Sequence, residues 1–222
     1  MTKNLRLTLA MVLVVILAMI GLITINRNRA DTPRAAADAG QPVDPAVLVR
    51  ADSHRLSTAA DGKVTLVEFL DFECEACGAV YPAIEEIRDT YGDRITFVVR
   101  YFPIPSHPNA ELAARAAQAA ANQDRFPQMY ATLFENQESW GHQRTPQTER
   151  FVEYARTIGL DVDRFQRDLD DPATAERVAR DRADGETAGV QGTPTFFLNG
   201  RQLTEIRTQA DMIAAIDAAL AG

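Results

Sequence analysis

The sequence contains only two cysteines, three histidines and one tryptophan among its 222 residues. Two cysteines are too few for the several disulfides that staple small secreted domains together. A structural zinc site needs four ligands, and His54, His107 and His142 are scattered without an H-x3-5-H pair. The composition therefore excludes a disulfide-rich scaffold and disfavours zinc, and we expect neither a metal nor a separate cofactor.

Positive charge is also in short supply. The chain has 23 lysine and arginine residues against 31 aspartate and glutamate residues, which gives a formal net charge of −8. Because nucleic acid is a polyanion, this balance disfavours nucleic-acid binding. Hydrophobic residues make up 46% of the chain and charged residues 24%, as in globular proteins.

Long hydrophobic runs are absent except for Leu9 to Ile25, in which Thr24 is the only polar residue. This run is longer than the apolar core of a cleavable signal, about 7 to 15 residues, and fits a spanning helix of roughly 17 to 25 residues. We therefore expect residues 1–26 to be a transmembrane anchor. The alternative is a signal segment that is cleaved in the alanine-rich stretch at 35–39.

The remaining chain is long enough for one ordinary domain. Residues 27–46 lack apolar periodicity and predict a flexible linker, so we expect the folded domain at 47–222. Two runs rich in β-branched and aromatic residues, 64–70 and 95–102, predict strands, and the apolar spacing over 76–91 predicts a helix between them. A crossover of this length joins parallel neighbours in one sheet.

Helical patterns then fill residues from about 108 to 189. TFFL at 195–198, the turn Asn199-Gly200 and RQLT at 201–204 predict a hairpin, and residues 211–220 predict a closing helix. The expected fold class is α/β, with a helical insert between the second strand of the strand-helix-strand unit and the C-terminal hairpin.

Cys74 and Cys77 stand at the predicted strand-to-helix turn. In a helix, residues i and i+3 lie on one face about 5 to 6 Å apart, a separation that a disulfide can bridge. Such a bond closes almost no chain and stabilises the fold little, so its use would be chemical. If the helix begins at Cys74, its free amide hydrogens and positive dipole end favour the thiolate there, and Cys77 would be the resolving thiol. Two buried, inert cysteines are the alternative.

Several stretches together resemble the DsbA-like thiol-disulfide oxidoreductases of the thioredoxin superfamily. These are VEFLDFECEAC, Pro82 in the following helix, RYFPIPSHPNA before the insert and GVQGTPTFFLNG after it. The resemblance covers residues 47–222. It implies a thioredoxin-like fold and disulfide exchange outside the cytoplasm, which agrees with the amino-terminal hydrophobic segment.

The resemblance also implies further site residues. The Thr193-Pro194 peptide would be cis and opposite the cysteines, where the Thr193 backbone would pair with an extended substrate segment. From the residues alone, a trans proline ahead of a strand is the alternative. Glu68 lies where the family carries an acid. Because its strand is otherwise apolar, we expect a buried carboxyl with a raised pKa that relays a proton for Cys77, rather than a solvent-exposed glutamate.

Three acids flank the pair: Asp71, Glu73 and Glu75. If they lie close to Cys74 they should raise the pKa of its thiol, and no cation stands between the cysteines to oppose them. DsbA owes its oxidising power to a stabilised reduced form. We therefore expect this protein to be less oxidising than DsbA.

Other polar and aromatic candidates are expected to be structural. Pro108 suits the first turn of a helix, so Ser106 or His107 should cap that helix rather than act in catalysis. Aromatic residues of the insert are expected in its core rather than on the floor of a peptide groove, namely Phe126, Tyr130, Phe134 and Trp140.

The leading hypothesis is dithiol-disulfide exchange through Cys74 and Cys77 on exported proteins that carry thiols, in the direction of disulfide formation. The alternatives are a reductase or isomerase, for instance in cytochrome maturation, and a non-redox peptide-binding chaperone. The resemblance implies a membrane quinone-linked reoxidase as partner. We expect the domain outside the cytoplasm, held by a single membrane-spanning segment or, after cleavage, secreted or periplasmic.

Overall fold

A computed structural model describes residues 42–222. The anchor or signal expected at 1–26, and residues 27–41 of the linker expected at 27–46, lie outside the described residues. The last two residues of the expected linker belong to a short helix, Pro45–Leu48. Within residues 42–222, no helix is long and apolar enough to cross a membrane.

The order of elements follows the sequence pattern closely. The strands are β1 (His54–Ser57), β2 (Thr65–Leu70), β3 (Thr96–Tyr101), β4 (Thr195–Leu198) and β5 (Arg201–Gln202). The helices outside the insert are α2 (Pro45–Leu48), α3 (Glu75–Tyr91), the short 3-10 helix η2 (Gly92–Arg94) and α10 (Gln209–Ala221). The helices of the insert are α4 (Ala110–Ala121), α5 (Phe126–Glu135), α6 (Gln137–Trp140), α7 (Thr148–Thr157), α8 (Val162–Asp170) and α9 (Pro172–Thr187).

The strands form one sheet in the order β1-β3-β2-β4-β5. β2 and β3 are parallel, as the crossover helix α3 requires, and β4 pairs antiparallel with β2. The predicted hairpin is confirmed, with positive φ at both Asn199 and Gly200, as a tight two-residue turn needs. β1 was not expected, because HRLS is short and half polar. The carboxyl end of the central strand β2 leads through a short loop to the cysteine pair at the start of α3.

Alternation along β2 divides its side chains between two apolar layers. Leu66 and Leu70 belong to the core that contains residues of α3 and α10, whereas Val67 and Phe69 belong to the core on the other face. Since side chains in a strand alternate, Glu68 falls on the face covered by α3. The strand thus carries a carboxyl into the apolar layer beneath the cysteine helix.

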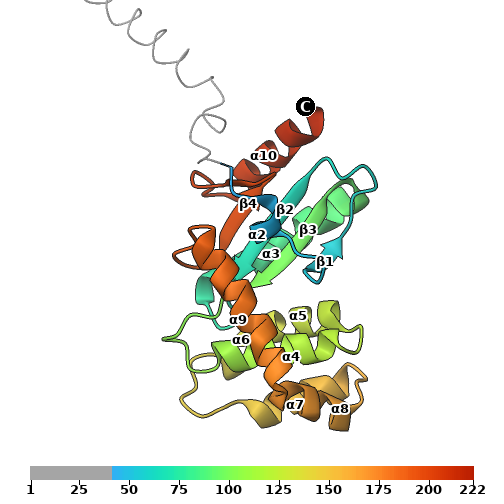
Figure 1. The fold of residues 1–222 in the computed structure, drawn as a ribbon, viewed down its shortest axis with the longest axis vertical. Coiled ribbons are helices and arrows are strands. Elements are labelled where there is room, and N and C mark those ends of the chain that lie inside the picture. Colours follow the sequence, from blue (N-terminus) through green and yellow to red (C-terminus); the bar gives the residue numbers. More distant parts are fainter. Residues whose placement is uncertain (1–41) are drawn as a thin grey trace, which may run out of the picture. The chain divides into compact units, whose positions relative to one another are not determined.

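The insert follows β3, with α4 to α8 gathered at one end of the domain and α9 running from them back toward the sheet (Figure 1). Small side chains on the buried face of α4 allow neighbouring helices to approach closely, namely Ala113, Ala114, Ala116, Ala117 and Ala120. The insert's aromatic residues are core, as predicted, and Trp140 is fully buried. α9 meets the sheet at Gly185, where a Cβ would lie 2.6 Å from the Phe102 ring.

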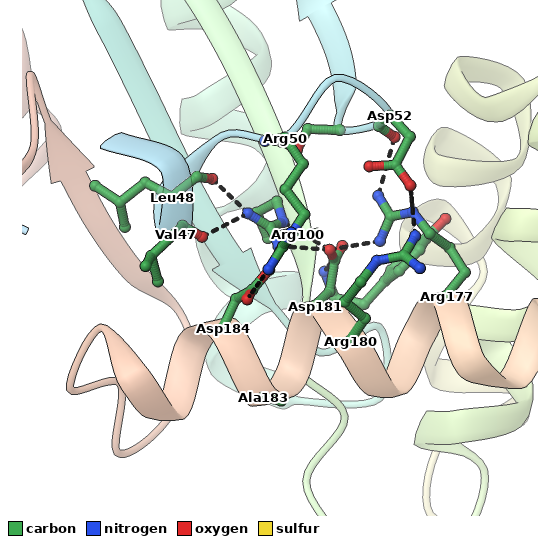
Figure 2. A network of polar contacts seen from close by, with 12 residues as sticks. Val47, Leu48, Arg50, Asp52, Arg100, Arg177, Arg180, Asp181, Ala183 and Asp184 are labelled. Carbon is green, nitrogen blue, oxygen red and sulfur yellow. Dashed lines mark hydrogen bonds and ion pairs between the residues drawn. The ribbon is translucent and has the colours of Figure 1, made fainter. Parts of the chain in front are cut away.

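A buried ion-pair network joins α9 to β3. The Arg100 side chain is fully buried and contacts Asp181 at 2.7 Å and Asp184 at 2.5 Å (Figure 2). It also donates hydrogen bonds to the carbonyl oxygens of Val47 and Leu48. Such a network is favourable only when each charge is matched, so Arg100 fixes the position of α9 on the sheet.

The same network holds the chain that precedes β1. Arg50 pairs with Asp184, and Asp52 accepts from Arg177 and Arg180 of α9 (Figure 2). The described chain already contacts the domain at Val43, whose N–H donates to Gly200 at 2.8 Å.

We predict that Arg100→Met lowers the free energy of unfolding by about 3 to 5 kcal/mol, because it leaves buried carboxylates without their shared cation. Arg156→Met is the matched control. Arg156 pairs with Glu153 on the surface, and its loss should cost no more than about 1 kcal/mol. Urea unfolding of both variants measures the difference, and equal losses would contradict a locking role for Arg100.

Candidate active site

The two cysteines occupy the first turn of α3. Cys74 is the N-cap residue and Cys77 lies one turn further, so the predicted helix start is confirmed. Cys74 is 9% exposed and Cys77 is 1% exposed, and both are free thiols. When protonated, the Cys74 thiol donates to the Thr193 carbonyl oxygen, which lies 3.3 Å away. Cys74 is therefore slightly exposed, whereas Cys77 is almost completely buried.

This placement drives the two thiol pKa values apart. Hydrogen bonding from the Cys77 thiol, and further donors that include the Cys77 and Ala76 amides, lower the pKa of Cys74 to about 5. Burial raises the pKa of Cys77 well above its ordinary value, and the thiol of Cys74 and the charge of Glu68 raise it further. At neutral pH the pair therefore holds a thiolate at Cys74 and a thiol at Cys77, which suits one sulfur for attack and the other for release.

Glu68 is 2% exposed, so its expected burial is confirmed. Desolvation raises the pKa of this carboxyl to about 8, with a smaller contribution from Glu85. Within the described residues, Glu68 Oε2 makes no hydrogen bond. An unpaired, buried carboxyl that is protonated at neutral pH is a proton donor within the electrostatic reach of Cys77.

The Thr193-Pro194 peptide bond is cis, as the resemblance implied. Pro194 also lines a cleft of about 440 Å³ between α3, the β4-β5 hairpin and the start of α10. Apolar side chains such as Val80, Ile84 and Phe196 form part of its wall, together with polar residues of the 202–209 segment. The structure thus brings Cys74, Thr193 and an open cleft side by side.

The expectation that the flanking acids raise the pKa of Cys74 is wrong. The Asp71 and Glu73 carboxylates are buried. Asp71 accepts from the Ile104 amide in the loop before α4, Glu73 accepts from two backbone amides of the insert, and the exposed Glu75 pairs with His142 at 3.0 Å. None of the three dominates the environment of the Cys74 sulfur, whose pKa is lowered. The expectation that this protein is less oxidising than DsbA rested on a raised pKa of Cys74 and is therefore not supported.

The capping role expected for Ser106 or His107 is also wrong. α4 begins at Ala110 with Asn109 at its N-cap position. The His107 ring instead lies against Asp71, with Nδ1 2.6 Å from Oδ2. The buried carboxyl of Asp71 offers this ring a stronger partner than the helix end does.

Gln137 was not expected at the site. Its side-chain amide donates to the carbonyl oxygens of Phe72 and Cys74 at 2.7 and 2.9 Å. It lies about sixty residues after the cysteines, and no motif marks it. In residues 42–222, no group of three or more His, Cys, Asp or Glu side chains is arranged to hold a metal ion.

Part of several longer proteins is similar in sequence to this chain. The chain is 37% identical over 181 residues to the Na(+)/H(+) antiporter NhaA of Herminiimonas arsenicoxydans, and 38% identical over 162 residues to NhaA 3 of Salinispora tropica. These matches cover 82% and 72% of this chain but only 27% and 23% of the relatives. The chain thus spans about a quarter of the length of these curated relatives.

Solved structures share the fold. A thioredoxin-like oxidoreductase from Silicibacter pomeroyi matches with a TM-score of 0.68 and 25% identity, over 81% of this chain and 99% of that one. BdbD from Bacillus subtilis matches with a TM-score of 0.68 and 22% identity, over 83% and 98% of the two chains. The Wolbachia pipientis thiol-disulfide exchange protein alpha-DsbA2 matches with a TM-score of 0.66 and 20% identity, over 78% and 90%.

These neighbours share the α/β architecture in which a helical insert separates β3 from β4. A family model described as Thioredoxin matches residues 55–218, which include the cysteine pair, the insert and the hairpin. The chain therefore belongs to this thioredoxin family, and its fold is of the DsbA-like type.

Proposed function

We propose that this protein is a thiol-disulfide oxidoreductase that forms disulfides in exported proteins through Cys74 and Cys77. One observation carries the proposal. The pKa of Cys74 is lowered to about 5 at the start of α3, while the pKa of Cys77, one turn away, is raised. Two thiols with opposed pKa shifts in one helical turn suit an exchange reaction and have no structural use.

The proposed reaction oxidises a substrate dithiol in two steps. A substrate thiolate attacks Cys74 Sγ of the Cys74–Cys77 disulfide. A disulfide bond forms between the substrate sulfur and Cys74, the bond between Cys74 and Cys77 breaks, and the Cys77 thiolate takes up a proton. A second substrate thiolate then attacks the substrate sulfur of this mixed disulfide and releases Cys74 as a thiolate. Two electrons pass from the substrate dithiol to the cysteine pair, and the substrate gains one disulfide.

The direction follows from the stability of the reduced form. Stabilising the Cys74 thiolate stabilises the dithiol state, and a protein whose reduced state is stabilised is a stronger oxidant. The lowered pKa of Cys74 therefore favours disulfide formation over the reductase or isomerase alternative.

Glu68 is proposed as the proton donor for Cys77. A thiolate released at Cys77 would be buried, where its charge is costly. The Glu68 carboxyl carries a proton at neutral pH and contributes to the electrostatic environment of that sulfur. Transfer from Glu68 would remove the charge as it forms.

Substrates are proposed to bind as extended segments beside Pro194. The backbone of Thr193 offers main-chain pairing next to Cys74, and the adjacent cleft offers apolar wall for side chains. A chaperone without redox chemistry would use the same cleft but would not need the opposed thiol pKa values.

We place this activity outside the cytoplasm, on the basis of the hydrophobic run at 9–25 and of the resemblance to DsbA-like proteins. The anchor would hold the domain at the membrane, or cleavage would release it. Repeated turnover requires an acceptor for two electrons, which we propose to be a membrane quinone-linked reoxidase.

Cys74→Ser should abolish oxidation of a reduced model protein, because the Cys74–Cys77 disulfide that accepts the two electrons can no longer form. Cys77→Ser should instead hold a mixed disulfide once its Cys74 thiolate has attacked a disulfide of the model protein, because Cys77 is not there to displace the bound sulfur. Thiol trapping followed by non-reducing electrophoresis separates these outcomes. Exchange that survives in Cys74→Ser would overturn the proposed function, whereas retained peptide binding in that variant would not.

Glu68→Gln should slow release of Cys77 by about 10²-fold at pH 7, because the buried donor is lost. The wild-type rate should fall as pH rises through about 8, where Glu68 loses its proton, and the variant should lack this step. The raised pKa of Glu68 also makes the free energy of unfolding depend on pH. The contribution of Glu68 is fully present below pH 4.5 and is lost as the pH rises through about 8. The Glu68→Gln variant should not show that loss of stability.

Stopped-flow exchange and urea unfolding across pH 4 to 9 measure both effects. Glu111→Gln, an exposed acid on α4, is the control and should follow the wild type. A Glu68→Gln profile that also follows the wild type would remove Glu68 from the mechanism.

A further inference from the structure

The helical insert makes hydrogen bonds to the loop that carries Cys74. Residues 71–74 connect β2 to α3, and their acidic side chains bind the insert and the loop that leads from β3 into it. Asp71 is 1% exposed, and its Oδ2 accepts from the Ile104 amide at 2.9 Å and lies 2.6 Å from His107 Nδ1. Its Oδ1 accepts from the Glu73 amide at 2.8 Å. One carboxyl thus fixes the start of the loop.

Glu73 makes the second attachment. It is fully buried and lies directly before Cys74. Its Oε2 accepts from the Asn109 amide at 2.6 Å and its Oε1 from the His142 amide at 2.7 Å. These donors stand at the start of α4 and just after α6, so a single carboxylate ties two distant segments of the insert to the residue before the nucleophile.

Gln137 makes the third attachment, from α6. Its Nε2 donates to the carbonyl oxygens of Phe72 and Cys74, on either side of Glu73. The contact requires glycine at position 78, because a Cβ there would lie 2.1 Å from Gln137 Oε1. The first turn of α3 therefore omits a side chain where the insert reaches the active-site loop.

These attachments bear on the chemistry of the sulfurs through the backbone. The Cys74 amide donates to the Asp71 carbonyl oxygen at 3.2 Å, so Asp71 and Glu73 govern where Cys74 sits relative to α3. The donors that lower the pKa of Cys74 act over hydrogen-bond distances, and they weaken steeply when the sulfur moves.

We propose that the insert, together with the loop that leads from β3 into it, positions Cys74 for thiol-disulfide exchange through Asp71, Glu73 and Gln137, which are positioning residues rather than modulators of charge at the sulfur. The acidic character of this loop then reflects the backbone amides that the insert presents. The proposal rests on the exchange function proposed above, and it assigns to the insert a direct part in the reactivity of the thioredoxin-like core.

Glu73→Gln tests the proposal with little change of shape. The glutamine keeps one acceptor oxygen, but its NH2 group cannot accept, so the amide of Asn109 or His142 loses its partner. We expect the pKa of Cys74 to rise by about one unit, and the equilibrium constant for oxidation of glutathione to fall about tenfold, equivalent to about 30 mV.

Gln137→Ala removes the third attachment without burying an unpaired charge, and it should shift both quantities in the same direction. Each substitution has a matched control. Asp181→Asn alters a buried carboxylate of α9 that binds Arg100 and the Tyr101 amide, and Gln128→Ala alters an exposed glutamine of α5. Both controls should leave the pKa of Cys74 unchanged, even where Asp181→Asn lowers stability.

The pKa of Cys74 is read from the pH dependence of iodoacetamide alkylation, and stability from urea unfolding. Lower stability with an unaltered Cys74 pKa in Glu73→Gln and Gln137→Ala would overturn the proposal, as would an equal shift in Asp181→Asn. If Glu73→Gln does not fold, Gln137→Ala decides alone. Absence of glutathione exchange in the wild type would refute the exchange function, while alkylation would still judge the positioning.

Discussion

The convergence of hydrogen-bond donors on Cys74 at the first turn of α3 is the constraint on which the site depends. The thiolate there is stabilised by the Cys77 thiol and by amides that only a helix start leaves free. The same geometry places Cys77 one turn deeper, where burial opposes ionisation. A single helix start therefore creates both the sulfur that bonds to the substrate and the sulfur that leaves. The remaining features keep that start in place or supply a proton to the leaving sulfur.

Buried acids in this domain are accommodated in three different ways. Asp181 and Asp184 meet the guanidinium of Arg100, so their charge is balanced. Glu73 receives two backbone amides and needs no cation. Glu68 has neither a cation nor a hydrogen bond at Oε2, and its raised pKa shows that it holds a proton instead. Only the third arrangement leaves a group free to exchange protons, and it is the one beneath the cysteines.

The sequence predicted the parts whose signals are local. Alternating or continuous apolar runs marked β2 and β3, and Asn199-Gly200 marked the hairpin, because each needs only its own backbone and neighbours. The cis bond before Pro194 and the role of Glu68 came from the family resemblance, since spacing alone left both open. The acids of the loop could not be interpreted. The orientation of the Glu73 side chain, for example, depends on the amides of Asn109 and His142, which lie 36 and 69 residues later in the sequence.

Proton balance links the opposed thiol pKa values to the direction of exchange. Between about pH 5 and 8, a substrate dithiol carries two protons, whereas the reduced pair carries one, on Cys77. Each disulfide formed in a substrate therefore releases one proton to solvent, and the equilibrium favours the substrate disulfide tenfold more for each unit of rising pH. The gain exists only while Cys74 stays ionised and Cys77 stays protonated. It therefore depends on the helix start that stabilises one sulfur and on the apolar core that keeps the other neutral.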